Sequence, residues 1–148
     1  MSLIALGCDG AGFALMKEVK SFLKSKGLEY KDLGAFDDGP VDYPIYAKSV
    51  AQAILKGEAT RGVLICGTGI GISVAANRFK GIRCSLVHDV FSAKSTREHN
   101  DSNVLAMGGR VIGAGLALEI LDTWLNTEFS GIERHQRRVD LIDSQMEV

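Results

Sequence analysis

The sequence predicts a three-layer α/β fold, in which helices cover both faces of a doubly wound, five-stranded parallel sheet. Short apolar runs alternate with longer segments of helical periodicity, and turns rich in Gly or Asp separate them. The chain has 148 residues, and no linker or low-complexity stretch divides it, which is typical of one domain. We therefore expect a single domain over residues 1–148.

Five strands are expected where short apolar runs are bounded by turn residues. The first run ends at Gly7, and the third continues into a glycine-rich turn. The five runs cover residues 3–6, 29–33, 63–66, 82–87 and 103–107. Parallel strands place their carboxyl ends at one edge of the sheet, and ligands bind at that edge in doubly wound folds.

Helices are expected where apolar residues recur at helical spacing between start and stop signals. Pro44 suits the first turn of one helix, Asp89 can cap another, and Gly27 and Gly57 are natural stops. The expected helices cover residues 15–23, 42–55, 73–77, 93–97, 113–126 and 131–148. The last of them is the most polar, and it forms the C-terminal tail.

Composition argues against several classes of protein. Lys and Arg number 17 and Asp and Glu 18, so the net charge of -1 argues against a broad nucleic-acid surface. No apolar run approaches the ~18 residues that span a bilayer, and the N-terminus lacks a secretory signal. Cys8, Cys66 and Cys84 form neither a disulfide framework nor a zinc-ribbon pattern. We therefore expect a cytoplasmic protein without nucleic-acid or membrane partners.

The glycine-rich turn after the third strand, Gly-Thr-Gly-Ile-Gly at residues 67–71, is the most informative stretch. Closely spaced glycines let the backbone approach a ligand, and the following helix start favours negative charge. The spacing fails the dinucleotide fingerprint, because Ile72 stands where the third glycine belongs, and no Walker sequence follows. From the residues alone, a turn that binds a phosphate or an oxyanion and a turn without a ligand both remain open.

Cys66 is the cysteine best placed for chemistry. It ends the third strand beside a helix N-terminus, a position that favours the thiolate. Cys8 also follows a strand, but the negative charge of Asp9 opposes its ionisation. Cys84 lies inside a strand, where a cysteine usually fills the core.

Polar residues at three other places are candidates for the site, and each also has a purely structural explanation. Asp9 follows the first strand, where it can face a ligand or cap a turn. His99 lies in a polar run before the fifth strand, which suits either proton transfer or a surface loop. Arg134 and Arg138 lie in the tail, which suits either a phosphate clamp joined by Arg110 or a solvated helix face.

Taken together, these stretches resemble the ribose-5-phosphate isomerase B family, which also contains the galactose-6-phosphate isomerase subunits. The Cys-Gly-Thr-Gly and His-Asn-Asp blocks are its specific motifs, and the matching stretches span nearly the whole chain in the family's order. They are residues 7–9, 11–13, 42–44, 65–73, 75–77, 97–101, 103–105, 134–135 and 138–139.

The resemblance implies a Rossmann-like sandwich that isomerises a phosphorylated sugar reversibly between aldose and ketose, without a metal or an organic cofactor. Ribose 5-phosphate and ribulose 5-phosphate are the expected pair. It also implies a homodimer or a dimer of dimers with active sites at the subunit interface. The helical tail, about residues 131–148, is then expected to contact a partner subunit.

The resemblance also implies roles for individual residues. Cys66 is implied as the base that moves a proton between C1 and C2, with Thr68 at the substrate oxygens. His99, together with Asp9, is implied in opening the sugar ring. The backbone amides of the turn would stabilise the enediolate, and one such donor is worth ~3 kcal/mol. The residues implied to contact the substrate are Tyr43, Gly67, Gly69, Ile70, Gly71, Ser73, Asn100, Arg110, Arg134 and Arg138, of which the three arginines hold the phosphate, some of them from the partner subunit.

Two positions depart from the family's pattern. The family usually has Asp-His near the first strand, whereas this chain has Asp9 and Gly10, which removes a polar contact and is expected to open space beside Asp9. Ile132 and Glu133 stand where the family often has two glycines, which is expected to shift the phosphate clamp. The alternative substrate is therefore a tetrose, another pentose or a hexose phosphate such as allose or galactose 6-phosphate.

Two further classes of protein remain as alternatives. A non-catalytic module that senses a sugar phosphate or a nucleotide would use the same turn, although it needs neither a base nor a ring-opening group. A covalent cysteine enzyme of the phosphatase kind would need an arginine where Ile72 stands.

Overall fold

The structure, a computed structural model, describes residues 3–144 and contains a sheet of five parallel strands. The strands are β1 (Ile4–Cys8), β2 (Tyr30–Asp32), β3 (Arg61–Cys66), β4 (Cys84–Leu86) and β5 (Val104–Gly108). They lie in the order β2-β1-β3-β5-β4, which confirms the predicted doubly wound α/β fold. This order places the carboxyl ends of β1, β3 and β5 side by side.

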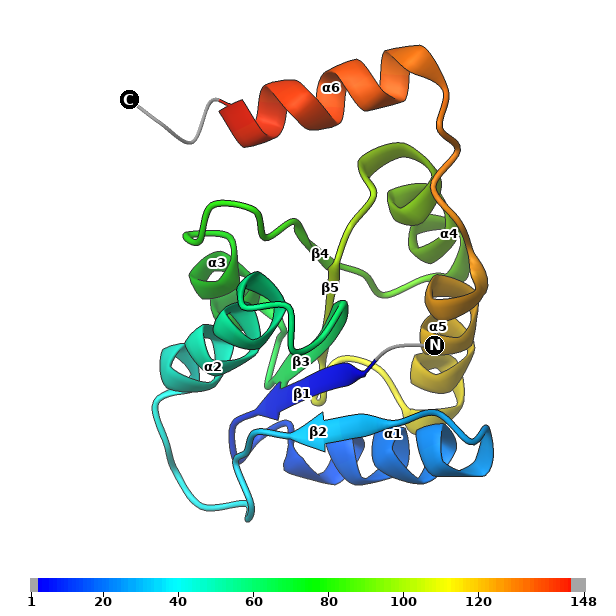
Figure 1. Ribbon diagram of the computed structural model, residues 1–148. Helices are drawn as coiled ribbons and strands as arrows, with labels where there is room; N and C mark the ends of the chain where they lie inside the picture. Colours follow the sequence, from blue (N-terminus) through cyan, green and yellow to red (C-terminus); the bar gives the residue numbers. More distant parts are fainter. Residues whose placement is uncertain (1–2, 145–148) are drawn as a thin grey trace.

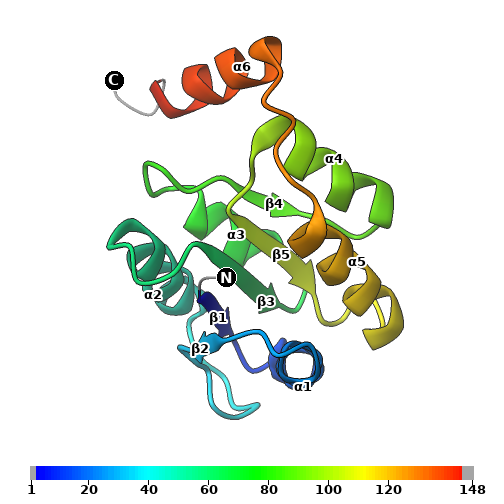
Figure 2. The ribbon, with the colours of Figure 1, turned by 45° about the vertical axis from the view of Figure 1, so that its right-hand side comes forward.

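Helices cover both faces of the sheet. They are α1 (Phe13–Ser25), α2 (Tyr43–Leu55), α3 (Ile70–Ala76), α4 (Val90–Asn100), α5 (Ala114–Asn126) and α6 (Glu133–Ser144). Figure 2 shows α1, α4 and α5 on one side of the sheet and α2 and α3 on the other. The last helix, α6, in red at the top of Figure 1, lies apart from both layers, beside the end of α4.

Alternation along the strands divides the core into two parts. Leu6, Ile65 and Leu105 pack in the part that α1, α4 and α5 cover, and Cys8 belongs to it. Cys66 packs in the other part, which α2 and α3 cover. Successive side chains of a strand point to opposite faces, so the two cysteines at neighbouring strand ends face opposite layers. Of these two, Cys66 is the one on the side of the glycine-rich turn and α3.

The first strand ends later than predicted. It continues past Gly7, so the prediction that the strand stops there is wrong. A Cβ at Gly7 would lie 3.0 Å from side-chain atoms of both Leu64 and Val50, so this glycine allows close packing of α2 on the sheet. The predicted helix cap is confirmed, because Asp89 Oδ1 accepts the N–H of Ser92 at 2.7 Å.

The fourth strand is shorter than predicted, because β4 lies at the edge of the sheet. The Asn77 side chain occupies its outer side, where Oδ1 accepts the Cys84 N–H at 2.8 Å and Nδ2 donates to the Cys84 carbonyl at 2.9 Å. The predicted tail helix is present as α6, and residues 145–148 of that prediction lie outside the described residues. Over residues 3–144, no helix is both long and apolar enough to span a membrane.

Candidate active site

Backbone hydrogen bonds hold three chain segments together beyond the carboxyl ends of β1, β3 and β5. The N–H of Asp9 donates to the Ile65 carbonyl at 3.2 Å, and the N–H of Arg110 donates to the Gly67 carbonyl at 2.9 Å. The residues that follow these three strands are therefore fixed next to one another, as the parallel order predicts.

Cys66 ends β3, and Thr68 lies in the glycine-rich turn that leads from there into α3. Cys66 is 4% exposed, and its Sγ accepts the N–H of Gly69 at 3.1 Å. Thr68 is exposed, and its Oγ1 accepts the N–H of Ile70 at 3.2 Å. The sulfur and the hydroxyl therefore both face the N–H donors of one turn, which is an environment suited to negative charge.

Gly69 fixes the shape of this turn. Its φ of 77° lies in the left-handed region, which favours glycine. A Cβ there would also lie 2.8 Å from the backbone carbon of Met107 and 2.6 Å from the side chain of Leu86. Conformation and close approach both exclude a side chain, so the position of the Cys66 sulfur depends on this glycine.

Tyr43, the first residue of α2, covers the first turn of α3. A Cβ at Gly71 would lie 2.5 Å from Tyr43 Cζ, so the phenol ring rests directly on that glycine. Ser73 differs from the other predicted contacts, because its N–H donates to the Gly69 carbonyl at 3.2 Å and its hydroxyl to the Ile70 carbonyl at 2.8 Å. Both donors of Ser73 are thus engaged within α3.

Asp9 and Arg110 line a cavity of about 320 Å³ beside the turn. One oxygen of Asp9, Oδ1, accepts the N–H of Gly12 at 3.0 Å, which orients the carboxylate. Arg110 is exposed and extends alongside Gly67, where a Cβ would lie 3.5 Å from both Cδ and Nη1 of the arginine. The cavity therefore combines a carboxylate and a guanidinium, which suits a polar ligand that carries a phosphate.

Backbone occupies the position that a side chain at residue 10 would take, which contradicts the expectation that Gly10 opens space there. A Cβ at Gly10 would run into the carbonyl oxygen of Gly39 and would lie 2.5 Å from that of Asp38. Residues 38–41, between β2 and α2, form one wall of the cavity. The backbone of Asp38 and Gly39 therefore fills the space that a side chain at residue 10 would occupy.

Four predicted site residues lie near the amino ends of the strands, opposite the carboxyl edge, on α4 and α6. They are His99, Asn100, Arg134 and Arg138, and all four are exposed. The strand β5 pairs with β3 from Val104, near the end of α4, to Gly108, which lies opposite Cys66. At ~3.3 Å per residue the two edges are about 13 Å apart. Within one chain, these residues do not meet Cys66.

His88 also lies at the carboxyl edge, although it is not among the residues predicted from the sequence. Its Nε2 accepts the N–H of Gly108, which pairs with Cys66, at 3.0 Å. Burial lowers the pKa of His88, against the opposing effect of Asp89, and so favours the neutral ring that accepts this bond. Its place directly after a strand and before a helix cap is the signal that would have identified it.

Cys8 and Cys84 have the character of unreactive thiols. Burial is the main cause that raises the pKa of Cys8 to about 11, and the charges of Asp32 and Asp9 raise it further. Burial alone raises the pKa of Cys84 to about 12. Both thiols are therefore almost fully protonated at neutral pH, where a thiolate is the reactive form.

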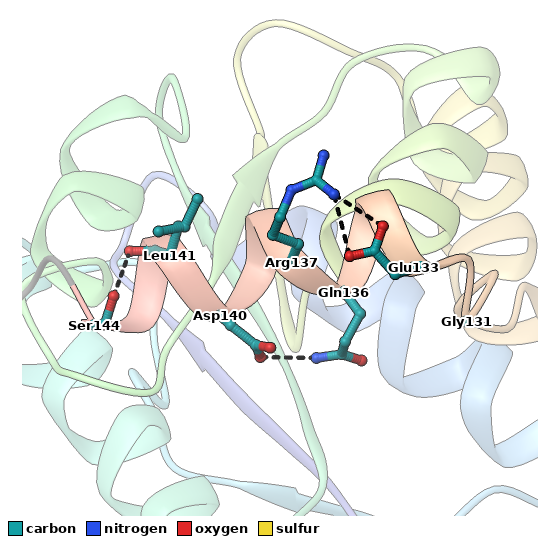
Figure 3. A pocket seen from close by; sticks show the side chains of 7 residues that line it. All are labelled: Gly131, Glu133, Gln136, Arg137, Asp140, Leu141 and Ser144. Atoms are coloured by element: carbon teal, nitrogen blue, oxygen red, sulfur yellow. Dashed lines mark hydrogen bonds and ion pairs between the residues drawn. The ribbon is translucent and has the colours of Figure 1, made fainter.

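A larger cavity of about 580 Å³ runs along α6, and Cys66 is not among the residues that line it; Figure 3 shows the lining side chains. Its polar side chains pair with one another: Arg137 Nη1 donates to Glu133 Oε2 at 2.8 Å, and Gln136 Nε2 donates to Asp140 Oδ1 at 2.8 Å. Since these pairs lie along one exposed helix, we place the candidate active site at the carboxyl edge instead, where polar groups from several segments converge.

Known proteins resemble this chain over nearly its whole length. Residues 4–142 match the protein family described as Ribose/Galactose Isomerase. The chain is 49% identical to ribose-5-phosphate isomerase B of Escherichia coli over 142 residues, 96% of this chain and 95% of that protein. It is 43% identical to the D-erythrulose-4-phosphate isomerase of Pectobacterium atrosepticum over 133 residues, 88% of this chain and 87% of that protein. The ribose-5-phosphate isomerase B of Clostridium thermocellum superposes with a TM-score of 0.95 and 47% identity, covering 97% of this chain and 96% of that one.

Proposed function

Because this chain belongs to the Ribose/Galactose Isomerase family, we propose that it interconverts D-ribose 5-phosphate and D-ribulose 5-phosphate. The position of Cys66 carries the proposal. Its sulfur accepts an N–H of the glycine-rich turn that also carries Thr68, and Gly67 of that turn lies against Arg110, which lines the cavity with Asp9. Proton transfer next to a carbonyl requires such a base together with such an anion site. The Escherichia coli relative, which is named for this activity, matches 96% of the chain.

The proposed proton transfer uses Cys66 as the single base. The thiolate removes the proton from C2 of the open-chain aldose, the C–H electrons form the C1=C2 double bond, and the carbonyl electrons move onto O1. Cys66 then returns its proton to C1, while O1 gains a proton and O2 loses one as the C2 carbonyl forms. The N–H groups of residues 67–71 stabilise the enediolate, with ~3 kcal/mol for one donor, and Thr68 orients the substrate oxygens.

The site is incomplete within one chain, because ring opening and phosphate binding need groups from the opposite edge. We assign ring opening to His99 of a second copy, assisted by Asp9 of the first. Arg110 of the first copy binds the phosphate together with Arg134 and Arg138 of the second. Two-fold symmetry completes both sites at once, since each copy contributes both edges.

Exposed apolar side chains beside the site support a homodimer. Ile70 and Val74 on α3 are 55% and 59% exposed, and Phe91 at the start of α4 is 80% exposed. Large apolar side chains that gather beside a polar site are typical of subunit interfaces. The helix α6 would contact the partner. We place the enzyme in the cytoplasm, where its three free cysteines stay reduced.

A shorter sugar phosphate is the alternative that a specific observation favours. Residues 38–41 close on Gly10 and limit the cavity beside Asp9. The Pectobacterium atrosepticum relative, at 43% identity, is named for a four-carbon ketose phosphate. The kcat/KM values for tetrose, pentose and hexose phosphates decide between these substrates, and a higher value for the tetrose would replace the ribose assignment.

The proposed function is tested by conversion of ribose 5-phosphate to ribulose 5-phosphate with a chelator present. Wild-type protein should turn over, and Cys66→Ala should lose about 10²–10⁴-fold in kcat, because this is what a positioned base contributes. Arg138→Ala should mainly raise KM, because the phosphate contact is remote from the reacting carbons.

Cys84→Ala is the matched control, since it removes a thiol that the mechanism does not use. Near-full activity in Cys66→Ala would show that the base is wrong. Tight binding of the whole panel of sugar phosphates without turnover would support a non-catalytic module instead.

A further inference from the structure

A second cluster of polar side chains lies where the end of α4 meets the start of α6. The rings of His99 and His135 have their centroids 4.5 Å apart, with planes tilted by 41°. His99 is exposed, whereas His135 is 7% exposed. The His99 ring therefore lies against a buried neighbour, while much of its own surface is exposed.

The ring of His135 is itself held in one orientation by Ser130. Ser130 Oγ lies 2.6 Å from His135 Nδ1 and accepts the N–H of Ile132 at 3.2 Å. The hydroxyl either donates to Nδ1 or accepts from it, depending on the tautomer of the ring, and in both cases the bond fixes the position of Nδ1. Burial is the main cause that lowers the pKa of His135, and the positive charges of His99, Arg134 and Arg138 act in the same direction, against Glu98.

Ser130 is tied to the helix that carries His99. Its N–H donates to the Glu98 carbonyl at 3.2 Å, and Arg97 Nε donates to the carbonyl of Thr127 at 3.1 Å in the same connecting segment. The hydroxyl, the His135 ring and the backbone next to His99 thus form one connected unit.

We propose that Ser130 and His135 are positioning residues, which hold the His99 ring in the orientation that opens the cyclic sugar. The inference rests on the proposed function, because it concerns the ring-opening step. Neither residue needs to touch the substrate. His135 supplies the surface against which His99 rests, and Ser130 fixes the tilt of that surface.

Ring opening and proton transfer can be measured separately. Ribose 5-phosphate is largely a closed furanose and must open before it reacts. Ribulose 5-phosphate has no free O5 with which to close a five-membered ring, so exchange of its C1 hydrogen with D₂O needs Cys66 but no ring chemistry. Isomerisation of ribose 5-phosphate and deuterium entry at C1 of ribulose 5-phosphate are therefore compared in each variant.

The variants are Ser130→Ala, His135→Phe and their combination. His135→Phe keeps a ring beside His99 but removes the nitrogen that binds Ser130. Each should lower kcat for ribose 5-phosphate by about 10-fold, less than the 10²–10⁴-fold of losing an acid–base group outright, with KM and deuterium exchange within 2-fold of wild type. The combination should be no worse than the stronger single variant, because both break the same contact.

Ser130→Thr, which keeps the hydroxyl, should restore kcat to the wild-type value. Ser144→Ala, at the end of the helix that carries His135, is the matched control. Equal losses of isomerisation and exchange, or no loss of either, would overturn the positioning role. If the wild-type enzyme isomerises no sugar phosphate, the proposed function fails and this inference fails with it. If the wild-type enzyme is active but the variants do not show the expected selective loss of ribose 5-phosphate isomerisation, only this inference fails and the proposed function stands.

Discussion

Glycines, which have no side chain, determine how closely the segments around Cys66 approach each other. A Cβ at Gly12 would lie 2.6 Å from the backbone carbon of Ile65, and Gly69 and Gly71 are covered by Met107 and Tyr43 in the same way. These positions sit in the strand-to-helix turns of the site, so a single methyl group would separate groups that must act together. Gly10 differs, because the segment that covers it is a connection between β2 and α2 whose residues 36–41 are mostly exposed.

Gly10→Ala should therefore change substrate choice more than stability. The added methyl group cannot coexist with the carbonyls of Asp38 and Gly39, so residues 36–41 must shift outward, at a cost of ~1–3 kcal/mol. A wider cavity should raise the ratio of kcat/KM for hexose 6-phosphates to that for ribose 5-phosphate. Gly115→Ala on α5 is the control, because a Cβ there meets open space. An unchanged ratio, with unchanged hydrogen exchange in residues 36–41, would mean that this segment does not limit the sugar.

Among the helices, α6 has the fewest contacts with the rest of the chain. His135 and Val139 are its only buried residues over Glu133–Ser144, and a bidentate pair at the far end supplements them. Arg83 Nη1 donates to both oxygens of Asp143, at 3.1 and 2.9 Å, and Arg83 Nη2 donates to the Asp101 carbonyl at 3.0 Å. Arg83 thus connects α6 to the end of α4.

Asp143→Ala should loosen the C-terminal half of α6 without unfolding the protein. The pair is partly exposed, so its loss should cost about 1 kcal/mol or less. Amide hydrogen exchange should rise several-fold in residues 139–144, and KM should rise with little change in kcat, because Arg138 on this helix is assigned to the phosphate. Asp140→Ala is the control, since within residues 3–144 Asp140 pairs only with Gln136 on the same helix. Equal effects of both variants would argue against the link through Arg83.

For the molecule as a whole, the sequence predicts which residues gather at the carboxyl edge. It does not predict the contacts that His88 and residues 38–41 make there. Cys66, Thr68 and Asp9 follow parallel strands, so the direction of those strands suffices to bring them together. The bond between His88 and Gly108 depends on β4 lying beside β5, and no periodic pattern encodes strand order. The backbone over Gly10 depends on the path of a segment without any periodicity.

The direction of the chain also explains why His99 lies at the amino ends of the strands, opposite Cys66. Each helix of a βα unit runs back from the carboxyl edge, so a residue in the last turn of α4 must lie near the amino ends of the strands. The catalytic groups that the family resemblance assigns to one site therefore lie at opposite ends of the strands within one chain, and this separation is the reason for the shared site that we propose.

A shared site predicts that two inactive variants restore each other. Cys66→Ala lacks the base at one edge, and His99→Ala lacks the ring-opening group at the other. When the two are unfolded together in equal amounts and refolded, half of the randomly formed dimers are hybrid, and each hybrid has one intact site of two, so about a quarter of wild-type activity should return. Cys66→Ala mixed with Thr68→Ala is the control, because both changes lie at the same edge: each hybrid site then keeps one of the two defects, and activity should stay at the level of the separate variants. The contrary outcome is that mixed dimers of Cys66→Ala and His99→Ala form without regaining activity. In that case His99 serves the same site as the Cys66 of its own chain, or it has no catalytic role, and the two-copy site is wrong.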